Sequence, residues 1–193
     1  MKPKFLNKIG LLTLVILATS CTTILVETTG AQGISEDPTE RTRGARVEDN
    51  SIETKVIVNL KSQAPAFRKA NFHAISYNGV VLLVGQVSSN DLKNRASEIA
   101  SQASTKIKRI HNELEVARKT TLGTRSKDTW IATKVRTLML ADSDVPSGQV
   151  RVITENGAVY LMGIIDQASG DHAARLARNV SGVTKVVKVF EYL

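Results

Sequence analysis

Hydrophobic residues recur at helical and at strand spacing in a fixed order, and that order occurs twice along the chain. Each copy predicts a helix, a pair of strands, a second helix and a last strand. The first helix is expected near 51–61 in one copy and near 129–141 in the other. Asn-Gly pairs between short apolar alternations, at 78–79 and 156–157, predict two-residue β-hairpins. Two helices on one face of a three-stranded sheet would give each copy an α+β fold.

The two copies are also alike in sequence. "YNGVVLLVGQV" at 77–87 returns as "ENGAVYLMGII" at 155–165, and the "IETKV" that begins at residue 52 returns as "IATKV" from residue 131. Two copies are too few for a solenoid, so the repeat predicts two small tandem domains. The expected boundaries are 49–117 for the first domain, 118–127 for a linker and 128–193 for the second domain.

The N-terminus predicts export. A basic start is followed by an apolar run from Ile9 to Ala18 and by small residues before Cys21. This is the pattern of a secretory signal peptide, expected over 1–20, and the run is short for a membrane-spanning helix. The end of the segment resembles the lipobox of bacterial lipoproteins, although Ala18 stands where leucine is usual. That resemblance implies that Cys21 is lipidated and, because Thr22 follows it, that the protein goes to the outer membrane. A plain signal peptide followed by a free cysteine is the alternative.

The hairpin sequences carry a family resemblance. A helix, an N-G-x-V-x-L-x-G hairpin, a second helix and an SGV-type turn before the last strand resemble the BON domain, and the likeness covers nearly all of 49–193. Gly85 and Gly163 fall on the family's characteristic glycine, and Gly79 and Gly157 lie in the hairpin turns. The first copy is looser, because "KIKRI" replaces the SGV-type turn.

The resemblance implies a non-enzymatic, lipid-anchored protein of the outer membrane that faces the periplasm of a Gram-negative bacterium. It further implies binding of anionic phospholipid, such as phosphatidylglycerol, through the first helix of the second domain. The implied role is support of envelope integrity, at division sites and in outer-membrane protein assembly. The alternative is an adaptor that docks an outer-membrane assembly machine or a cell-wall hydrolase regulator.

The first helix of the second copy has an apolar side that its own core does not need. On a helical wheel, Trp130 and Leu140 lie outside a core-facing stripe about 100° wide. Ser51 and Lys61 stand at the matching positions of the first copy. A tryptophan and a leucine beside cations suit a membrane interface, so only the second domain is expected to contact lipid. The expected core stripe is Ile131, Val135, Leu138 and Met139, and the expected lipid-binding residues are Trp130, Thr133, Lys134, Arg136, Thr137 and Leu140. The alternative is that Trp130 packs against the first domain or the linker.

Composition narrows the partners. The net charge is +8, and 23 lysines and arginines still face 18 acidic residues once the first twenty residues are set aside. Such a charge is compatible with nucleic acid, but export and an aromatic content of only 4% favour an anionic membrane. Residues 21–48 have no apolar period and are expected to form a flexible tether.

No constellation of residues points to catalysis, a metal or a cofactor. The chain lacks a phosphate-binding glycine loop, a nucleophile elbow and a zinc-protease motif. His73, His111 and His172 are scattered, and none has a partner at metal-ligand spacing. Asp128 with the "DSD" at 142–144 lacks the ordered spacing of a calcium loop. The sequence therefore predicts a binding protein and not an enzyme.

Overall fold

The structure, a computed structural model, describes residues 40–193. The expected signal peptide at 1–20, the lipidation of Cys21 and most of the expected tether at 21–48 lie outside these residues. Within 40–193 no helix combines the length and the apolar character needed to cross a bilayer.

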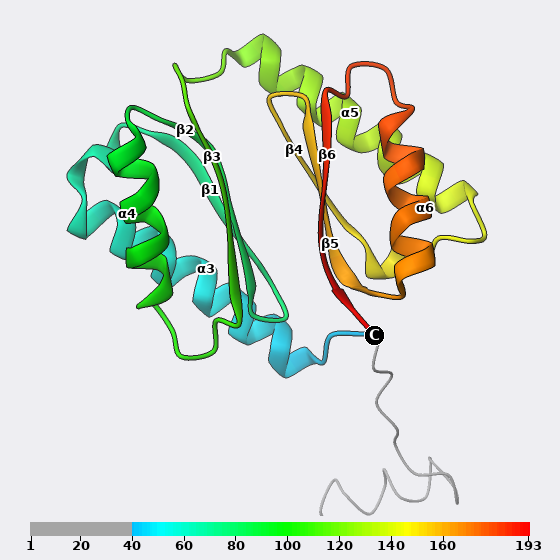
Figure 1. The fold of residues 1–193 in the computed structure, drawn as a ribbon, viewed down its shortest axis with the longest axis horizontal. Coiled ribbons are helices and arrows are strands. Elements are labelled where there is room, and N and C mark those ends of the chain that lie inside the picture. Colours follow the sequence, from blue (N-terminus) through cyan, green and yellow to red (C-terminus); the bar gives the residue numbers. More distant parts are fainter. Residues whose placement is uncertain (1–39) are drawn as a thin grey trace, which may run out of the picture. The chain divides into compact units, whose positions relative to one another are not determined.

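The first domain has the expected order of helix, two strands, helix and strand. Strand β2 is the middle of a three-stranded sheet, paired antiparallel with β1 and parallel with β3. A short 3₁₀ turn joins the first helix to the sheet. The elements are α3 (Arg43–Gln63), β1 (Asn71–Tyr77), β2 (Val80–Val87), α4 (Asn90–Ser101) and β3 (Arg109–Val116) (Figure 1).

The second domain repeats this arrangement. Strand β5 is central, antiparallel to β4 and parallel to β6. The predicted α+β fold, with the αββαβ order in both copies, is confirmed. The elements are α5 (Leu122–Ala141), β4 (Arg151–Glu155), β5 (Ala158–Ile165), α6 (Gln167–Arg178) and β6 (Lys185–Tyr192).

Both first helices begin earlier than the hydrophobic period indicates. The threonine before each helix caps it, since the Thr42 hydroxyl accepts from Ala45 N and the Thr121 hydroxyl accepts from Thr124 N. The end of the expected tether is therefore helical from Arg43, and the expected linker is helical from Leu122. The added turns are mostly polar and carry no core stripe, so periodicity alone missed them.

In each domain the two helices pack against one face of the sheet. In the first domain Ile52, Val56 and Leu60 of α3 lie fully buried against the sheet, beside residues of α4. In the second domain Ile131, Val135 and Met139 occupy the matching places on α5.

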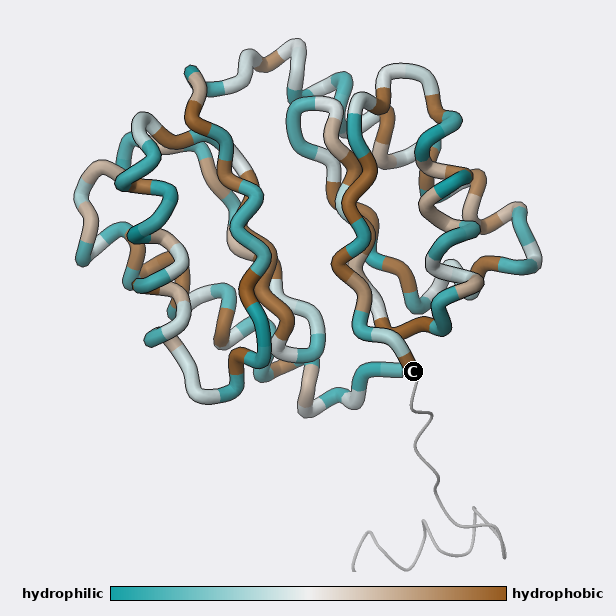
Figure 2. Tube along the Cα trace, in the orientation of Figure 1, coloured by the Kyte–Doolittle hydropathy of each residue, from teal (hydrophilic) through white to brown (hydrophobic). Residues whose placement is uncertain are grey.

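The opposite faces of the two sheets are buried against each other. One apolar cluster contains residues of both sheets, among them Leu82 and Val84 of β2 and Tyr160 and Met162 of β5. Every residue of β2 and of β5 is buried, because each strand is covered by helices on one side and by the other sheet on the other. Figure 1 shows the helices of each domain on the side of its sheet away from the other domain, and Figure 2 shows hydrophobic residues along the strands between them.

The contact between the domains is reciprocal, as in a dimer with two-fold symmetry. Asn78 of the first hairpin donates to Glu191 (2.7 Å), and Asn156 of the second hairpin donates to Glu115 (3.2 Å). These two asparagines are equivalent in the repeat, and so are the two glutamates. The duplicated chain thus forms within one molecule the kind of interface that two identical subunits would form.

Candidate lipid-binding site

One side of α5 is buried against the second sheet, and the opposite side faces outward. Ile131, Val135 and Met139 are at most 1% exposed and hold the helix on the second sheet. This confirms three of the four residues expected in the core stripe. The fourth, Leu138, is 42% exposed, so the expectation of burial is wrong for that position.

The residues opposite this stripe form an apolar surface. Trp130 is 47% exposed and Leu140 is 73% exposed. The Nζ atom of Lys134 lies 4.7 Å from the centre of the Trp130 ring, within the range of a cation–π contact. Trp130 does not belong to the cluster that joins the two domains. An aromatic ring, an aliphatic side chain and a cation are thus presented together at the surface.

Threonine hydroxyls on this side are satisfied inside the helix. Thr133 donates to the carbonyl of Thr129 (2.9 Å), and Thr137 donates to the carbonyl of Thr133 (3.0 Å). A hydroxyl that already donates within the helix loses less on leaving water than a free hydroxyl. The two exposed threonines therefore lower the cost of bringing this side into an interface.

Leu122 extends the surface at the start of α5. It is 79% exposed, and it lies about five full turns before Leu140, on the same line along the helix. Sequence reasoning missed it because residue 122 was assigned to the linker. Its signal is the threonine cap at Thr121, which extends the helix and puts Leu122 on the wheel position of Leu140.

Arg136 lies at the edge of this surface. Its Nη2 atom donates to the carbonyl of Val152 in β4 at 2.7 Å, which leaves its other N–H groups available. The predicted residues Trp130, Thr133, Lys134, Thr137 and Leu140 are all exposed on α5, and Arg136 is exposed beside the second sheet.

The first helix of the first domain lacks this surface. Ser51 is half-buried where α5 has Trp130, and the exposed Lys61 stands where α5 has Leu140. Val47 and Val58 are exposed on α3, at 70% and 56%, but no exposed aromatic accompanies them. The apolar outward surface is therefore specific to the second domain.

A buried aspartate in each first helix holds the hairpin of its own domain. The carboxylate of Asp128 accepts from the backbone N–H groups of Asn156 (2.9 Å) and Gly157 (2.8 Å). Asp49 accepts the equivalent pair, from Asn78 (2.8 Å) and Gly79 (2.9 Å). These turns have positive φ at both residues, which is why Asn-Gly fits them. An aspartate 29 residues before Asn-Gly in the first copy and 28 residues before it in the second is the sequence signal that could have indicated this contact.

Asp49 is bonded more extensively than Asp128. It also accepts from the Ser76 hydroxyl (2.6 Å) and from the guanidinium of Arg41 (2.8 Å). Burial acts to raise the pKa of Asp49, but the hydrogen bonds from Ser76, Gly79, Arg41 and Asn78 together outweigh it and hold the pKa below its ordinary value.

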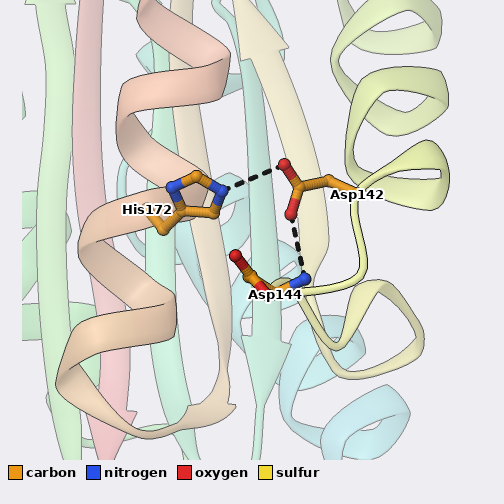
Figure 3. Close-up of side chains that lie close together, drawn as sticks. All are labelled: Asp142, Asp144 and His172. Atoms are coloured by element: carbon orange, nitrogen blue, oxygen red, sulfur yellow. Dashed lines mark hydrogen bonds and ion pairs between the residues drawn. The ribbon is translucent and has the colours of Figure 1, made fainter.

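The structure brings His172 to two of the aspartates that end α5. His172 Nε2 lies 3.0 Å from Asp142 Oδ2, and the Asp142 carboxylate also accepts from Asp144 N at 3.0 Å (Figure 3). The three side chains are close enough to hold one cation, a grouping that sequence spacing did not predict. Asp128, considered with them from the sequence, instead holds the hairpin.

The protons in this cluster favour a structural role. Arg175 Nη2 lies 3.3 Å from His172 Nδ1, and a guanidinium can only donate. Nδ1 can accept from Arg175 only in the tautomer that carries the proton on Nε2, and in that tautomer Nε2 donates to Asp142 and offers no lone pair to a metal. The hydrogen bond from His172 is the main cause that lowers the pKa of Asp142. The cluster links the end of α5 to α6.

The two strand glycines are required by close backbone contacts. A Cβ atom at Gly85 would lie 2.2 Å from the carbonyl oxygen of Asn71, and one at Gly163 would lie 2.3 Å from that of Gln149. Gly85 also has a φ of +123°, a conformation that side chains disfavour. Both positions exclude any larger residue.

The chain is similar in sequence to known proteins. The BON domain matches residues 48–118 and 127–193. The outer membrane lipoprotein DolP of Haemophilus influenzae is 39% identical over 163 residues, which cover 84% of this chain and 83% of that protein. The 21 kDa hemolysin of Actinobacillus pleuropneumoniae is 39% identical over 153 residues, covering 79% and 78% of the two chains. Among solved structures, the C-terminal domain of CdsD, a structural protein of the type III secretion system of Chlamydia trachomatis, matches with a TM-score of 0.30 and 13% identity over 75% of this chain and 67% of that one.

Proposed function

This chain belongs to the BON domain family, and from that membership we propose that it is a lipid-anchored protein of the outer membrane whose second domain binds anionic phospholipid through α5. The Haemophilus relative is named an outer membrane lipoprotein, which supports this location. The proposed anchor is Cys21, and the two domains are proposed to face the periplasm. BON domains are non-enzymatic, so the protein acts by binding. Its role is to support envelope integrity, at division sites and in outer-membrane protein assembly.

The observation that carries the proposal is the apolar outward surface of α5. Trp130 and Leu140 are exposed there, Leu122 extends the same line, and Lys134 lies over the tryptophan ring. Large apolar side chains enter the boundary between headgroups and acyl chains, while adjacent cations meet the phosphates. Each basic residue close to an anionic surface contributes about 1 kcal/mol.

The test is binding of the protein to vesicles, followed by Trp130 fluorescence. Trp130 is the only tryptophan, so a blue shift on adding phosphatidylglycerol vesicles, and none with phosphatidylcholine, reports entry of this helix into the interface. Burying a leucine contributes about 1.5–3 kcal/mol, so Leu140→Glu should weaken binding by roughly tenfold or more. The fold should survive, because Leu140 touches no core.

Val58→Glu is the matched control. Val58 is an exposed aliphatic residue on the equivalent helix of the first domain, and its replacement should leave lipid binding within about twofold. If folded Leu140→Glu protein binds anionic vesicles as the unchanged protein does, or if Trp130 fluorescence does not respond, the lipid proposal is wrong. The surface would then belong to a protein partner, such as an outer-membrane assembly machine or a cell-wall hydrolase regulator.

A further inference from the structure

A second basic site lies between the two domains, away from the outward line of α5. A cavity of about 290 Å³ is lined by the start of the first domain on one side and by the segment around β4 on the other. Four arginines line the cavity. Within residues 40–193, Glu40 is the only acidic residue that lines it. The arginines are Arg41, Arg46, Arg136 and Arg151.

Three of these guanidiniums are held in place by the protein. Arg41 lies 3.8 Å above the ring of Tyr77, in addition to its bond with Asp49. Arg136 donates to the carbonyl of Val152. Arg151 donates to Glu53 (3.2 Å) and to the carbonyl of Ser76 (3.3 Å), and so it bridges the two domains. A ligand that meets these groups pays little to order them.

The positive charge of the cavity is only partly neutralised. Asp49 pairs with Arg41, and Glu53 pairs with Arg151. In the described part of the chain, no carboxylate pairs with Arg46 or with Arg136. Two of the four arginines therefore have no acidic partner, and the guanidinium groups of the other two are already oriented. The cavity is left with net positive charge and with N–H donors that can bind an anion.

We propose that this cavity binds the phosphate of a small phosphate ester, of which an anionic phospholipid headgroup is one source and a free phosphate compound another. Guanidinium groups match phosphate in geometry and form charge-assisted hydrogen bonds with it. The volume lies at the lower end for small-molecule sites, which suits a headgroup without its acyl chains. Arg136 joins this cavity to the edge of α5, so a headgroup held here would lie beside the proposed membrane-binding helix.

The test uses water-soluble probes that have no acyl chains and cannot engage the apolar surface of α5. Glycerophosphoglycerol and inorganic phosphate are titrated separately into the intact, isotopically labelled protein in non-ionic detergent, at low salt. Saturable shifts of backbone amide signals should concentrate at residues 148–152 and spare the Trp130 indole. Tighter binding of glycerophosphoglycerol assigns the site to a headgroup, and equal or tighter binding of phosphate assigns it to a free phosphate compound.

Charge reversal at Arg46 tests the site without disturbing the fold, because Arg46 is exposed and contacts no carboxylate. Arg46→Glu should weaken binding of the preferred probe by about tenfold or more, since it removes one charge-assisted contact and adds repulsion. Arg43→Glu is the matched control, because Arg43 is exposed in the same first turn of α3 and does not line the cavity. It should change the affinity by no more than about twofold.

The proposal is overturned if neither probe binds saturably, or if Arg46→Glu and Arg43→Glu weaken binding equally. This inference uses the proposed lipid function only for one possible source of the phosphate. Vesicle binding that depends on Leu140 and probe binding that depends on Arg46 can each fail while the other holds.

Discussion

Removing the aspartate that holds each hairpin should destabilise its domain, and the first domain should lose more. Asp128→Ala leaves the N–H of Gly157 buried without a partner and that of Asn156 partly exposed. A hydrogen bond to a charged group contributes about 1.5–3 kcal/mol, so two such bonds, one of them near water, predict a loss of about 2–4 kcal/mol. Asp49→Ala breaks two further hydrogen bonds, those from the Ser76 hydroxyl and from the Arg41 guanidinium, and leaves the Arg41 charge uncompensated, which raises the expected loss to about 3–5 kcal/mol.

Urea unfolding measures these losses. Circular dichroism follows both domains, and Trp130 fluorescence follows α5 in particular. Asp128→Asn should fall between the unchanged protein and Asp128→Ala, because the amide keeps one acceptor oxygen for two donors.

Asp171→Ala is the control for removing a carboxylate as such. Asp171 pairs with Lys188 at the surface, where both side chains are about 40% exposed, and such pairs contribute less than about 1 kcal/mol. The reasoning is refuted if Asp128→Ala unfolds at the same urea concentration as the unchanged protein, or if Asp49→Ala costs less than Asp128→Ala.

Three further predictions concern the anchor, the strand glycines and a half-buried histidine. Cys21→Ala should leave the protein unprocessed or soluble in the periplasm, and continued palmitate labelling and outer-membrane fractionation would contradict the anchor. Gly163→Val or Gly85→Val should destabilise its domain by a few kcal/mol, measured as a lower thermal midpoint; unchanged melts would contradict the steric argument. Burial, with the charge of Arg109, lowers the pKa of His111, whose Nε2 lies buried without a hydrogen-bond partner. The unfolded chain therefore takes up a proton first, so stability should fall as pH drops through about 6.5. In urea titrations at pH 7 and pH 5, His111→Gln protein should lose less unfolding free energy on acidification than the unchanged protein. An equal loss in the two proteins would refute the prediction.

The sequence by itself determined the elements and their repetition, because those signals are local. The two-residue turns at 78–79 and 156–157 have positive φ at both positions, a conformation that Asn and Gly adopt more readily than other residues. The Asn-Gly pairs therefore indicate both hairpins. The helical period of α5 separated Ile131, Val135 and Met139 from Trp130 and Leu140, and their exposure in the structure agrees.

Errors at the helix ends have a physical cause. The wheel places Leu138 at the margin of the core stripe, and a side chain at the margin is buried only where a neighbouring element covers that side. Leu138 is exposed near the end of α5, whereas Met139, the next residue, is buried. Leu122 lies in a turn that only the Thr121 cap indicates.

Only the tertiary structure decided how the two domains meet. The unbroken apolar runs of β2 and β5 indicate that both faces of each strand are buried. They do not indicate what covers the face that is turned away from the helices. The answer depends on pairs far apart in the chain, such as Asn78 with Glu191 and Arg151 with Glu53. The arginine cavity and the His172 cluster arise in the same way, since each gathers residues from separate elements. Sequence periodicity records which side of an element is buried, whereas a site made by two packed elements depends on the relative position that packing alone sets.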